Sequence, residues 1–554
     1  MRLIAMAGTV VLALGLVSCV EEQAGHDMSQ HMTSTGSMPL FDNLGVHSHP
    51  ITTHAPEAQA YFDQGYRLLF NFNHAGAIAS FQEALKRDPS CAMCWWGIGF
   101  AHGPNINMPM MPDAVAPAVH AVEMAQQLAP GASAKEQGYI AALAKRYSSD
   151  PKAERAALDR AFMEAMRALA KRHPKDLDAQ VLYAEALMDT SPWDYWKADR
   201  RTPKAGYENL VPTIEAVLKR APRHPGAMHL YIHAVEASLT PQRAEKYADA
   251  LGPMLPGAGH LVHMPTHIYN RIGRYDDGVV WNQKAARADE AYIAATGERG
   301  MYAAMYYVHN LHFVWTAATN DGRSALALEY AQNVVDKVQP QMARQLPSVE
   351  AFVPTKLYAQ LRFGKWNDVL AADKPDAALH YATAMWHYAR ARALAKTGKL
   401  VEAGNESAMI ASSFSADDAT NFQNFGVPGE DMVRIAGHIA RADIASAKGD
   451  WADAVNELKA AVTAQDHLSY TEPPWWDFPT RGFLGAALIQ AGRASEAVDV
   501  YREDLKEWPK NGWSLYGLSV ALRKAGRSRE ALAAEAAYKK AWVRADVTLR
   551  ESRF

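Results

Sequence analysis

A helix-pair pattern near the start of the chain restricts the fold more than any other feature of the sequence. Small residues that let two antiparallel helices approach are followed by an aromatic residue that fills the groove and by a proline that ends the second helix. The set is Tyr61, Gly65, Ala77, Phe81, Ala84 and Pro89, and Trp95 and Gly99 repeat its first two positions 34 residues later. Because one such pair cannot bury its apolar face alone, the pattern predicts a stack of similar units.

This set of residues resembles the tetratricopeptide repeat (TPR). The pattern returns late in the chain as Gly485, Ala497, Tyr501 and Pro509, with a weaker copy that ends near Tyr538. The resemblance implies an all-α fold for residues 57–554, a TPR-like α-solenoid of about twelve antiparallel helix pairs whose first helices line a concave face.

Glycine turns and inserted segments fill the space between the first and last units. Each turn glycine is followed five residues later by a small or apolar residue, at Gly273, Gly322, Gly364, Gly398 and Gly449. The segments that interrupt the repeat cover residues 103–113, 190–205, roughly 286–300 and 471–478. Loops added to one face of a repeat array often build its binding site.

Histidines recur in matching register in the centre of the array, about residues 224–320. His229 and His263 are 34 residues apart, as are His233 and His267, whereas His260 and His309 are 49 apart, as are His263 and His312. Helical residues spaced i, i+4 and i+7 project from one face. The repeat is therefore expected to bring these imidazoles and Glu236 together in the concave groove.

Pro265 interrupts the second of these histidine segments. Proline removes a backbone donor and collides with the preceding turn, so the helix must kink at this residue or begin there. In the second case His260 and His263 would lie on a loop that enters the helix.

A metal centre is the first interpretation of this pattern. Buried imidazoles without partners would cost desolvation energy, and seven histidines with one carboxylate suffice for two metal ions with three or four ligands each. Imidazole ligands in an exported protein favour copper or zinc. The predicted ligands are His229, His233, Glu236, His260, His263, His267, His309 and His312. The alternative is a hydrogen-bonding groove for an acidic or peptide ligand.

The N-terminus predicts export. One basic residue and a short apolar run precede Cys19, which indicates a secretory signal and not a membrane span. Leu16-Val17-Ser18-Cys19 resembles the lipobox of bacterial lipoproteins and implies cleavage after residue 18 and lipidation of Cys19; an ordinary signal peptide is the alternative. Val20 resembles the outer-membrane pattern, which implies a protein that faces the periplasm and touches the membrane only through its anchor. Residues 19–56 are Met- and His-rich without periodicity and predict a flexible tether.

Composition narrows the other possibilities. The net charge of −3 and the lack of a Lys/Arg run argue against a nucleic-acid partner. Cys91 and Cys94 in an exported protein favour a local disulfide over a metal or redox pair.

Two functions fit the sequence. The first is a lipid-anchored protein with a copper or zinc site in its groove. One version of this hypothesis has a dinuclear and catalytic site. The second, which the TPR resemblance implies, is a scaffold that binds peptide or protein partners without a metal. No phosphate loop, GxSxG or HExxH motif is present to decide whether the chain is an enzyme.

Overall fold

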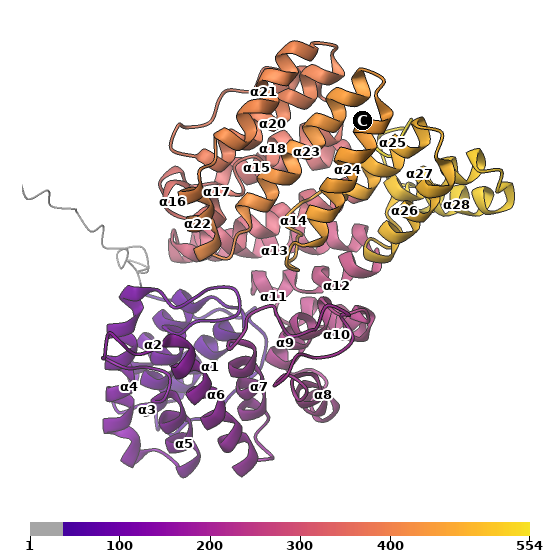
Figure 1. The fold of residues 1–554 in the computed structure, drawn as a ribbon. Helices are drawn as coiled ribbons and strands as arrows, with labels where there is room; N and C mark the ends of the chain where they lie inside the picture. The colour runs from indigo at the N-terminus through magenta and orange to yellow at the C-terminus, as the bar shows by residue number, and fades with distance from the viewer. Residues whose placement is uncertain (1–36) are drawn as a thin grey trace, which may run out of the picture.

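The computed structural model describes residues 37–554, which fold into a superhelix of α-helices (Figure 1). Within this range the β-structure is limited to two isolated bridges, Asn105 with Met108 and Trp196 with Pro203. The prediction of an all-α helical-repeat solenoid is confirmed. The predicted signal peptide, Cys19 and residues 19–36 of the predicted tether lie outside the described residues.

The first helices form an N-terminal lobe, drawn in indigo and purple in Figure 1. They are α1 (Pro56–Phe70), α2 (His74–Arg87), α3 (Ala92–Ala101), α4 (Val115–Leu128), α5 (Ala134–Leu143), α6 (Arg155–Arg172), α7 (Leu177–Met188) and α8 (Leu210–Arg220).

The central helices connect this lobe to the C-terminal one. They are α9 (Pro225–Glu236), α10 (Glu245–Leu251), α11 (Gly259–His263), α12 (Pro265–Ile272), α13 (Tyr275–Thr296) and α14 (Val308–Asn320), and a π-helical segment, Tyr302–Tyr307, leads into α14.

The C-terminal lobe, in orange and yellow in Figure 1, contains the remaining helices. They are α15 (Ser324–Lys337), α16 (Pro340–Gln345), α17 (Pro347–Glu350), α18 (Thr355–Arg362), α19 (Trp366–Leu370), α20 (His380–Lys396), α21 (Leu400–Ser412), α22 (Ala416–Asn424), α23 (Gly429–Ala447), α24 (Trp451–Asp466), α25 (Thr480–Gln490), α26 (Ala494–Glu507), α27 (Gly512–Lys524) and α28 (Ser528–Ala541).

An aromatic ring between two glycines joins consecutive units. The Phe81 ring on α2 lies so close to Gly65 on α1 and Gly97 on α3 that a Cβ added to either glycine would be 2.6 Å from it. Tyr501 on α26 occupies the same place between Gly485 and Gly517, with a distance of 2.3 Å. The glycine of the next unit that contacts Phe81 is therefore Gly97. It lies two residues before Gly99, the position that the repeat pattern indicates, because Gly97 is the residue of α3 that faces α2.

The predicted glycine turns are turns between antiparallel helices. Gly273 (φ 72°) separates α12 from α13, and Gly449 (φ 79°) separates α23 from α24. A left-handed residue after the last helical position reverses the chain, and glycine adopts it without a steric penalty. The other three predicted turn glycines also have positive φ.

Three of the four predicted insertions are loops, and one is not. Residues 103–113, 190–205 and 471–478 are mostly irregular. The loop expected at about 286–300 is wrong for most of its length, because α13 continues to Thr296. The helical periodicity of that segment continues through the expected boundary of the repeat, so the added residues lengthen a helix.

Residues 37–55, expected to be part of a flexible tether, instead pack along the first repeats as an N-terminal strap. The Phe41 amide donates to Gln64 Oε1 at 2.8 Å, and Asn43 O accepts from the Gly257 amide at 2.9 Å. Two apolar side chains of the strap, Met38 and Leu44, are buried. These contacts order a segment whose sequence has no periodicity of its own.

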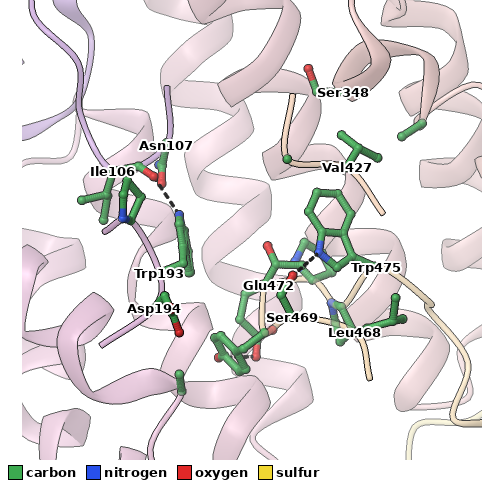
Figure 2. Close-up of a pocket in the computed structure, with 18 of the residues that line it drawn as sticks. Ile106, Asn107, Trp193, Asp194, Ser348, Val427, Leu468, Ser469, Glu472 and Trp475 are labelled. Atoms are coloured by element: carbon green, nitrogen blue, oxygen red, sulfur yellow. Dashed lines mark hydrogen bonds between the residues drawn. The ribbon is translucent and has the colours of Figure 1, made fainter. Parts of the chain in front are cut away.

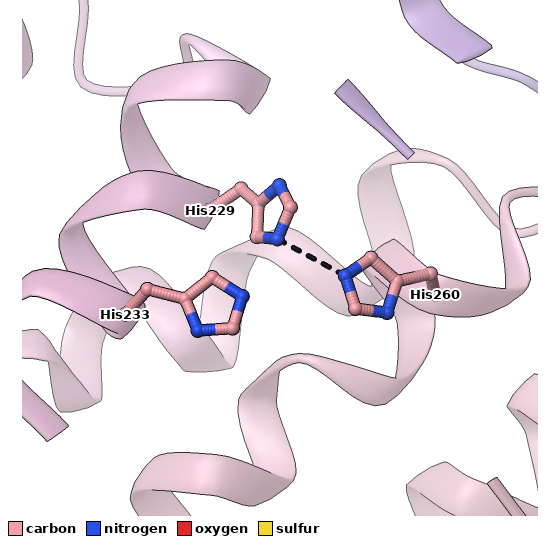
Figure 3. Close-up of side chains that lie close together, drawn as sticks. All are labelled: His229, His233 and His260. Carbon is pink, nitrogen blue, oxygen red and sulfur yellow. Dashed lines mark hydrogen bonds between the residues drawn. The ribbon is translucent and has the colours of Figure 1, made fainter. Parts of the chain in front are cut away.

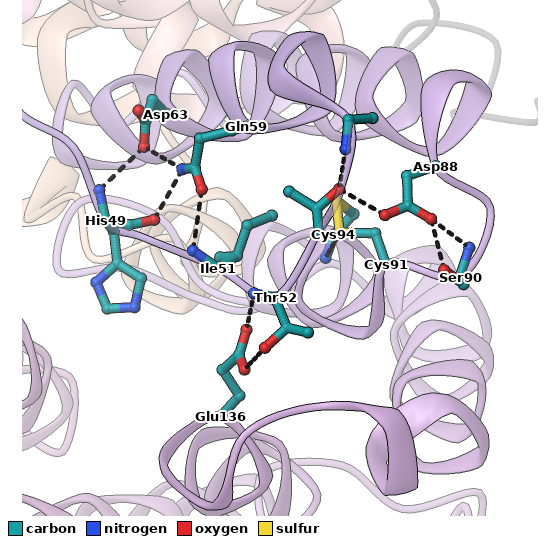
Figure 4. The surroundings of a disulfide bond; sticks show 12 residues. His49, Ile51, Thr52, Gln59, Asp63, Asp88, Ser90, Cys91, Cys94 and Glu136 are labelled. Carbon is teal, nitrogen blue, oxygen red and sulfur yellow. Dashed lines mark hydrogen bonds between the residues drawn. A yellow bond between two sulfur atoms is a disulfide. The ribbon is translucent and has the colours of Figure 1, made fainter.

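A disulfide joins Cys91 and Cys94 at the start of α3 (Figure 4). Beside it the strap is bonded to the first repeats through the His49 amide to Asp63 and the Thr52 amide to Glu136. Of the described helices, none has the length and apolar character needed to cross a membrane.

We expect Gly65→Ala to lower the free energy of unfolding by about 1–3 kcal/mol, because the new methyl group would overpack against Phe81. Gly404→Ala is the matched control, since Gly404 lies within α21 with no atom within 4 Å of an added Cβ. It should be neutral or stabilise by up to about 1 kcal/mol through helix propensity. Urea denaturation measures both variants; equal effects would contradict the packing argument.

Candidate metal centre

Four central helices bring six of the predicted histidines into one continuous cluster. Helix α9 contributes His229 and His233, α11 contributes His260 and His263, and the remaining two lie on α12 and α14. Adjacent rings have centroids 4.8–5.7 Å apart along the series His229, His260, His263, His267, with His309 4.8 Å from His263. The register seen in the sequence therefore converges in space.

The interruption at Pro265 preserves this convergence. Helix α11 ends at His263 and α12 begins at Pro265, but the intervening Met264 keeps helical dihedral angles (φ −50°, ψ −35°). The Met264 amide still donates to His260 O at 3.0 Å. Of the two alternatives, a kinked helix or a helix that begins near Pro265 after a loop, the loop is wrong, because α11 carries both His260 and His263 and the helical conformation continues through Met264 into α12.

His229, His233 and His260 form the first triad (Figure 3). Each offers a ring nitrogen, and these three atoms lie within 4.8 Å of one another. His229 Nε2 is 3.1 Å from His260 Nε2, and His233 Nε2 is buried without a hydrogen-bond partner. Each of the three side chains is at most 2% exposed.

His263, His267 and His309 form the second triad, which meets the same 4.8 Å limit. His263 Nε2 and His267 Nε2 are 2.8 Å apart. His309 is half-buried and borders the cavity described below. The remaining predicted ligand, His312, stands apart from both triads, with its Nε2 3.8 Å from Asp477 Oδ1.

Glu236 links the two triads. Its Oε1 accepts from His233 Nδ1 at 2.7 Å and its Oε2 accepts from His267 Nδ1 at 2.6 Å. The side chain is fully buried, and the histidines hold the pKa of Glu236 at about 2 against the opposing effect of burial. An ionised carboxylate on Nδ1 fixes the tautomer of each ring and leaves its Nε2 as a free lone pair.

The hydrogen bonds of the second triad leave two lone pairs facing each other. His267 donates through Nδ1 to Glu236, so its Nε2 carries no proton when the ring is neutral. His263 Nδ1 is 2.6 Å from Asn282 Oδ1, and this amide is oriented because Asn282 Nδ2 donates to Gly278 O at 2.8 Å. His263 is therefore also protonated on Nδ1, and two unprotonated nitrogens lie 2.8 Å apart.

The surroundings of most rings in the cluster lower their pKa values and so favour the neutral form of the imidazole. Burial first, and then the neighbouring histidines, lower the pKa values of four rings well below 6.5, those of His229, His260, His263 and His309. Burial alone lowers the pKa of His312 to about 3. Neutral imidazole is the form that coordinates a metal ion.

Three aromatic residues enclose the triads. Phe72 contacts His229 with ring centroids 4.5 Å apart, Trp193 contacts His233 at 5.0 Å, and Phe313 contacts His263 at 4.5 Å. Phe72 (φ 52°) and Trp193 (φ 67°) both adopt the left-handed backbone region, a strain that is concentrated at functional sites. Phe72 is not among the residues that the sequence predicts for the site, because its only local signal is the turn after the first repeat helix.

A second group with metal-ligand composition, His47, Asp178 and His224, has the opposite arrangement of protons. The His224 Nδ1 accepts from the Ala227 amide at 3.2 Å, so its Nε2 donates to Asp178 Oδ1 at 3.0 Å. His47 and His49 also bond to the same carboxylate. Every nitrogen that faces Asp178 is a donor, and this group ties the N-terminal strap to the solenoid.

The triads border a cavity of about 1150 Å³. His260, His267, His309 and His312 reach its wall, and three insertions line it, residues 103–113, 190–205 and 471–478 (Figure 2). Trp193 Nε1 donates to Ile106 O at 2.9 Å, which joins two of these insertions. Tyr470, just before the third, donates to Glu472 at 2.7 Å and to Glu236 at 3.3 Å.

The fold and this cavity define an all-α helical-repeat protein. No protein-family profile and no curated protein sequence matches the chain. Solved structures align with most of the chain, but their similarity to it is low. Human IFIT1 bound to m7Gppp-AAAA is 12% identical over 89% of this chain and 91% of its own, with a TM-score of 0.33. Yeast Tom70 is 12% identical over 88% and 97%, with a TM-score of 0.27. At these scores the site has to be judged by its own geometry.

We expect the metal-free protein to lose stability steeply on acidification. Below about pH 6.5 the unfolded chain binds protons that the buried rings of the folded chain do not, so the free energy of unfolding falls with pH. Each strongly shifted histidine contributes up to about 1.4 kcal/mol per pH unit, and the five named above together contribute on the order of 5 kcal/mol between pH 6.5 and 5.5.

The measurement is urea denaturation at several pH values. His263→Leu/His309→Leu removes two of the five titrating rings. It should reduce the slope of the free energy of unfolding against pH by the contribution of about two protons. The exposed His120 serves as the control, and His120→Leu should leave the slope unchanged. Equal slopes for the wild type and the double variant would contradict the assignment.

Proposed function

We propose that this helical-repeat protein binds two transition-metal ions, one at each histidine triad. The pair of unprotonated nitrogens on His263 and His267, 2.8 Å apart, carries the proposal. Two lone pairs at that distance repel each other unless a proton or a cation lies between them. We infer that a metal cation lies between them and resolves the contact.

The donor set favours zinc or copper. Each triad offers three neutral imidazole nitrogens and no thiolate, a combination that suits both ions. Ligands at 2.0–2.1 Å on a tetrahedral ion are about 3.3 Å apart. The ring pairs now 2.8 and 3.1 Å apart would need to separate by only a few tenths of an ångström. Glu236 would orient ligands of both ions, so we assign it a positioning role in place of the ligand role expected from the sequence.

The cavity gives this site the features of a catalytic centre. Three protein ligands leave a coordination position open, as in catalytic zinc sites, and a bound ion would supply Lewis-acid or redox chemistry there. The His267 and His309 side chains reach the cavity wall. Tyr470 and Glu472 lie at the same wall and can hold or pass a proton beside the second triad. We propose metal-assisted hydrolysis or oxidation as the reaction class, in an exported protein anchored through Cys19.

A scaffold function is the second candidate, and the size of the cavity favours it. A space of about 1150 Å³ exceeds the volume that a small molecule usually fills. Its lining mixes aromatic and charged side chains, such as Trp193, Trp475 and Arg271, and could accommodate a peptide segment. In that case the triads would be polar elements of a protein-binding groove.

Elemental analysis of the full-length chain, purified in detergent without an added histidine tag, tests the proposal. Residues 37–55 must be retained because the strap packs on the first repeats. We expect two equivalents of zinc or copper per chain. His229→Ala/His260→Ala should lose one equivalent and His263→Ala/His309→Ala the other, while Glu236→Gln should weaken metal affinity about 10–100-fold at both triads.

His47→Ala/His224→Ala is the matched control. It removes a histidine pair with the same residue types but with donor nitrogens, and it should keep both equivalents. Circular dichroism establishes that each variant is folded. A folded wild-type protein that contains no metal and takes up neither zinc nor copper would exclude the metal function and leave the scaffold function.

A further inference from the structure

Asp477 is a buried carboxyl group in the cavity wall. It belongs to the 471–478 insertion, its side chain is 10% exposed, and its Oδ1 has no hydrogen-bond partner among the described residues. The nearest basic side chain in an ion-pair geometry is His312, whose Nε2 is 3.8 Å from this oxygen. At this distance the two groups are too far apart for a hydrogen bond.

Six of the eight other carboxyl groups that line the cavity form ion pairs. The pairs are Asp159 with Arg155, Asp189 with Arg146, Asp194 with Lys204, Asp466 with Arg481, Glu503 with Lys506 and Glu507 with Arg200. The positive charges of Arg271 and Arg481 lower the pKa values of the other two, Glu472 and Asp504 respectively. At Asp477, burial raises the pKa well above its usual range, and only a backbone hydrogen bond opposes this. The fold thus leaves one carboxyl group of this wall without a counter-charge.

Aromatic side chains line the same part of the cavity as this carboxyl group. Tyr358 and Tyr381 lie close enough for the charge of Asp477 to raise their pKa values, and their hydroxyl groups are 3.0 Å apart. The Trp476 ring is 6.3 Å from that of Tyr358, and Phe352 packs on His312 at 5.3 Å. All four aromatic residues line the cavity.

The chemistry of these groups selects an organic cation. Aromatic rings around a carboxylate attract an ammonium group through cation–π interactions and direct charge pairing. A metal ion fits less well, because His312 and Asp477 supply two ligands where zinc needs at least three from the protein. An ammonium group would supply the counter-charge that favours the carboxylate form of Asp477, which a neutral polar ligand cannot do.

We propose that Asp477, Tyr358, Tyr381, Trp476 and Phe352 form a binding site for the ammonium group of an organic amine. His312 borders this amine site, and His309 of the second triad precedes it on α14 by three residues, about 4.5 Å along the helix axis. An amine held there would present its other end to the histidines. The inference adds a ligand class to the proposed function, but the amine site does not require a bound metal.

Isothermal titration of the full-length, metal-free chain tests this inference. The probes are butylamine and tetramethylammonium, with butanol and butyrate as neutral and anionic analogues of butylamine. We expect both cations to bind at least about tenfold more tightly than either analogue. Asp477→Asn, which keeps the shape of the side chain, should abolish this preference.

Two further variants separate the possible outcomes. Asp373→Asn, at an exposed position, should retain the preference for cations. His263→Ala/His309→Ala should also retain it, so a failure of the metal proposal does not affect this test. The inference would be overturned if folded wild-type protein bound neither cation, if butanol bound as tightly as butylamine, or if Asp477→Asn still preferred the amines.

Discussion

The close approach of helices around a single aromatic ring is the contact on which the rest of the structure depends. Phe81 lies between Gly65 and Gly97 near the start of the chain, and Tyr501 lies between Gly485 and Gly517 near its end. Because each ring contacts glycines of two successive units, it fixes both the distance and the register between them. A fixed register turns a spacing along the sequence into a position in space, and the clustering of the histidines follows from it.

Within the cluster, the chemistry is decided by the groups that bind the outer ring nitrogens. Glu236 accepts from two histidines, and an oriented Asn282 accepts from a third, so the inner nitrogens of these rings carry no proton when the rings are neutral. Around Asp178 the same residue types are arranged with their protons pointing inward. In the first arrangement the inner nitrogens of neutral rings face each other as lone pairs, whereas the second is a complete set of hydrogen bonds. Composition and proximity alone would not separate the two.

The cavity depends on contacts between parts of the chain that are far apart in sequence. Glu507 of α26 binds Arg200 in the second insertion at 2.6 Å and Arg271 on α12 at 3.3 Å. Tyr275 on α13 donates to Pro509 O at 3.1 Å. These bonds hold the C-terminal repeats against the central helices, so that Tyr470 and the 471–478 insertion face the triads. A second polar group, around Asp477, thereby lies beside the histidines on the same wall.

The sequence by itself determined the helical-repeat fold, the turn glycines and the helical faces that carry the histidines, because small residues, aromatic residues and glycines act through local geometry and nearest-neighbour packing. It also located the three insertions that became cavity walls. Only the tertiary structure decided the division into two triads, the hydrogen bonds from both triads to Glu236, the separation of His312 and the packing of residues 37–55. These depend on which distant group binds each ring nitrogen or backbone amide, and such contacts leave no periodic signal in the chain. Phe72 shows the same limit, since its place against His229 follows from the superhelix that brings the first repeat onto α9.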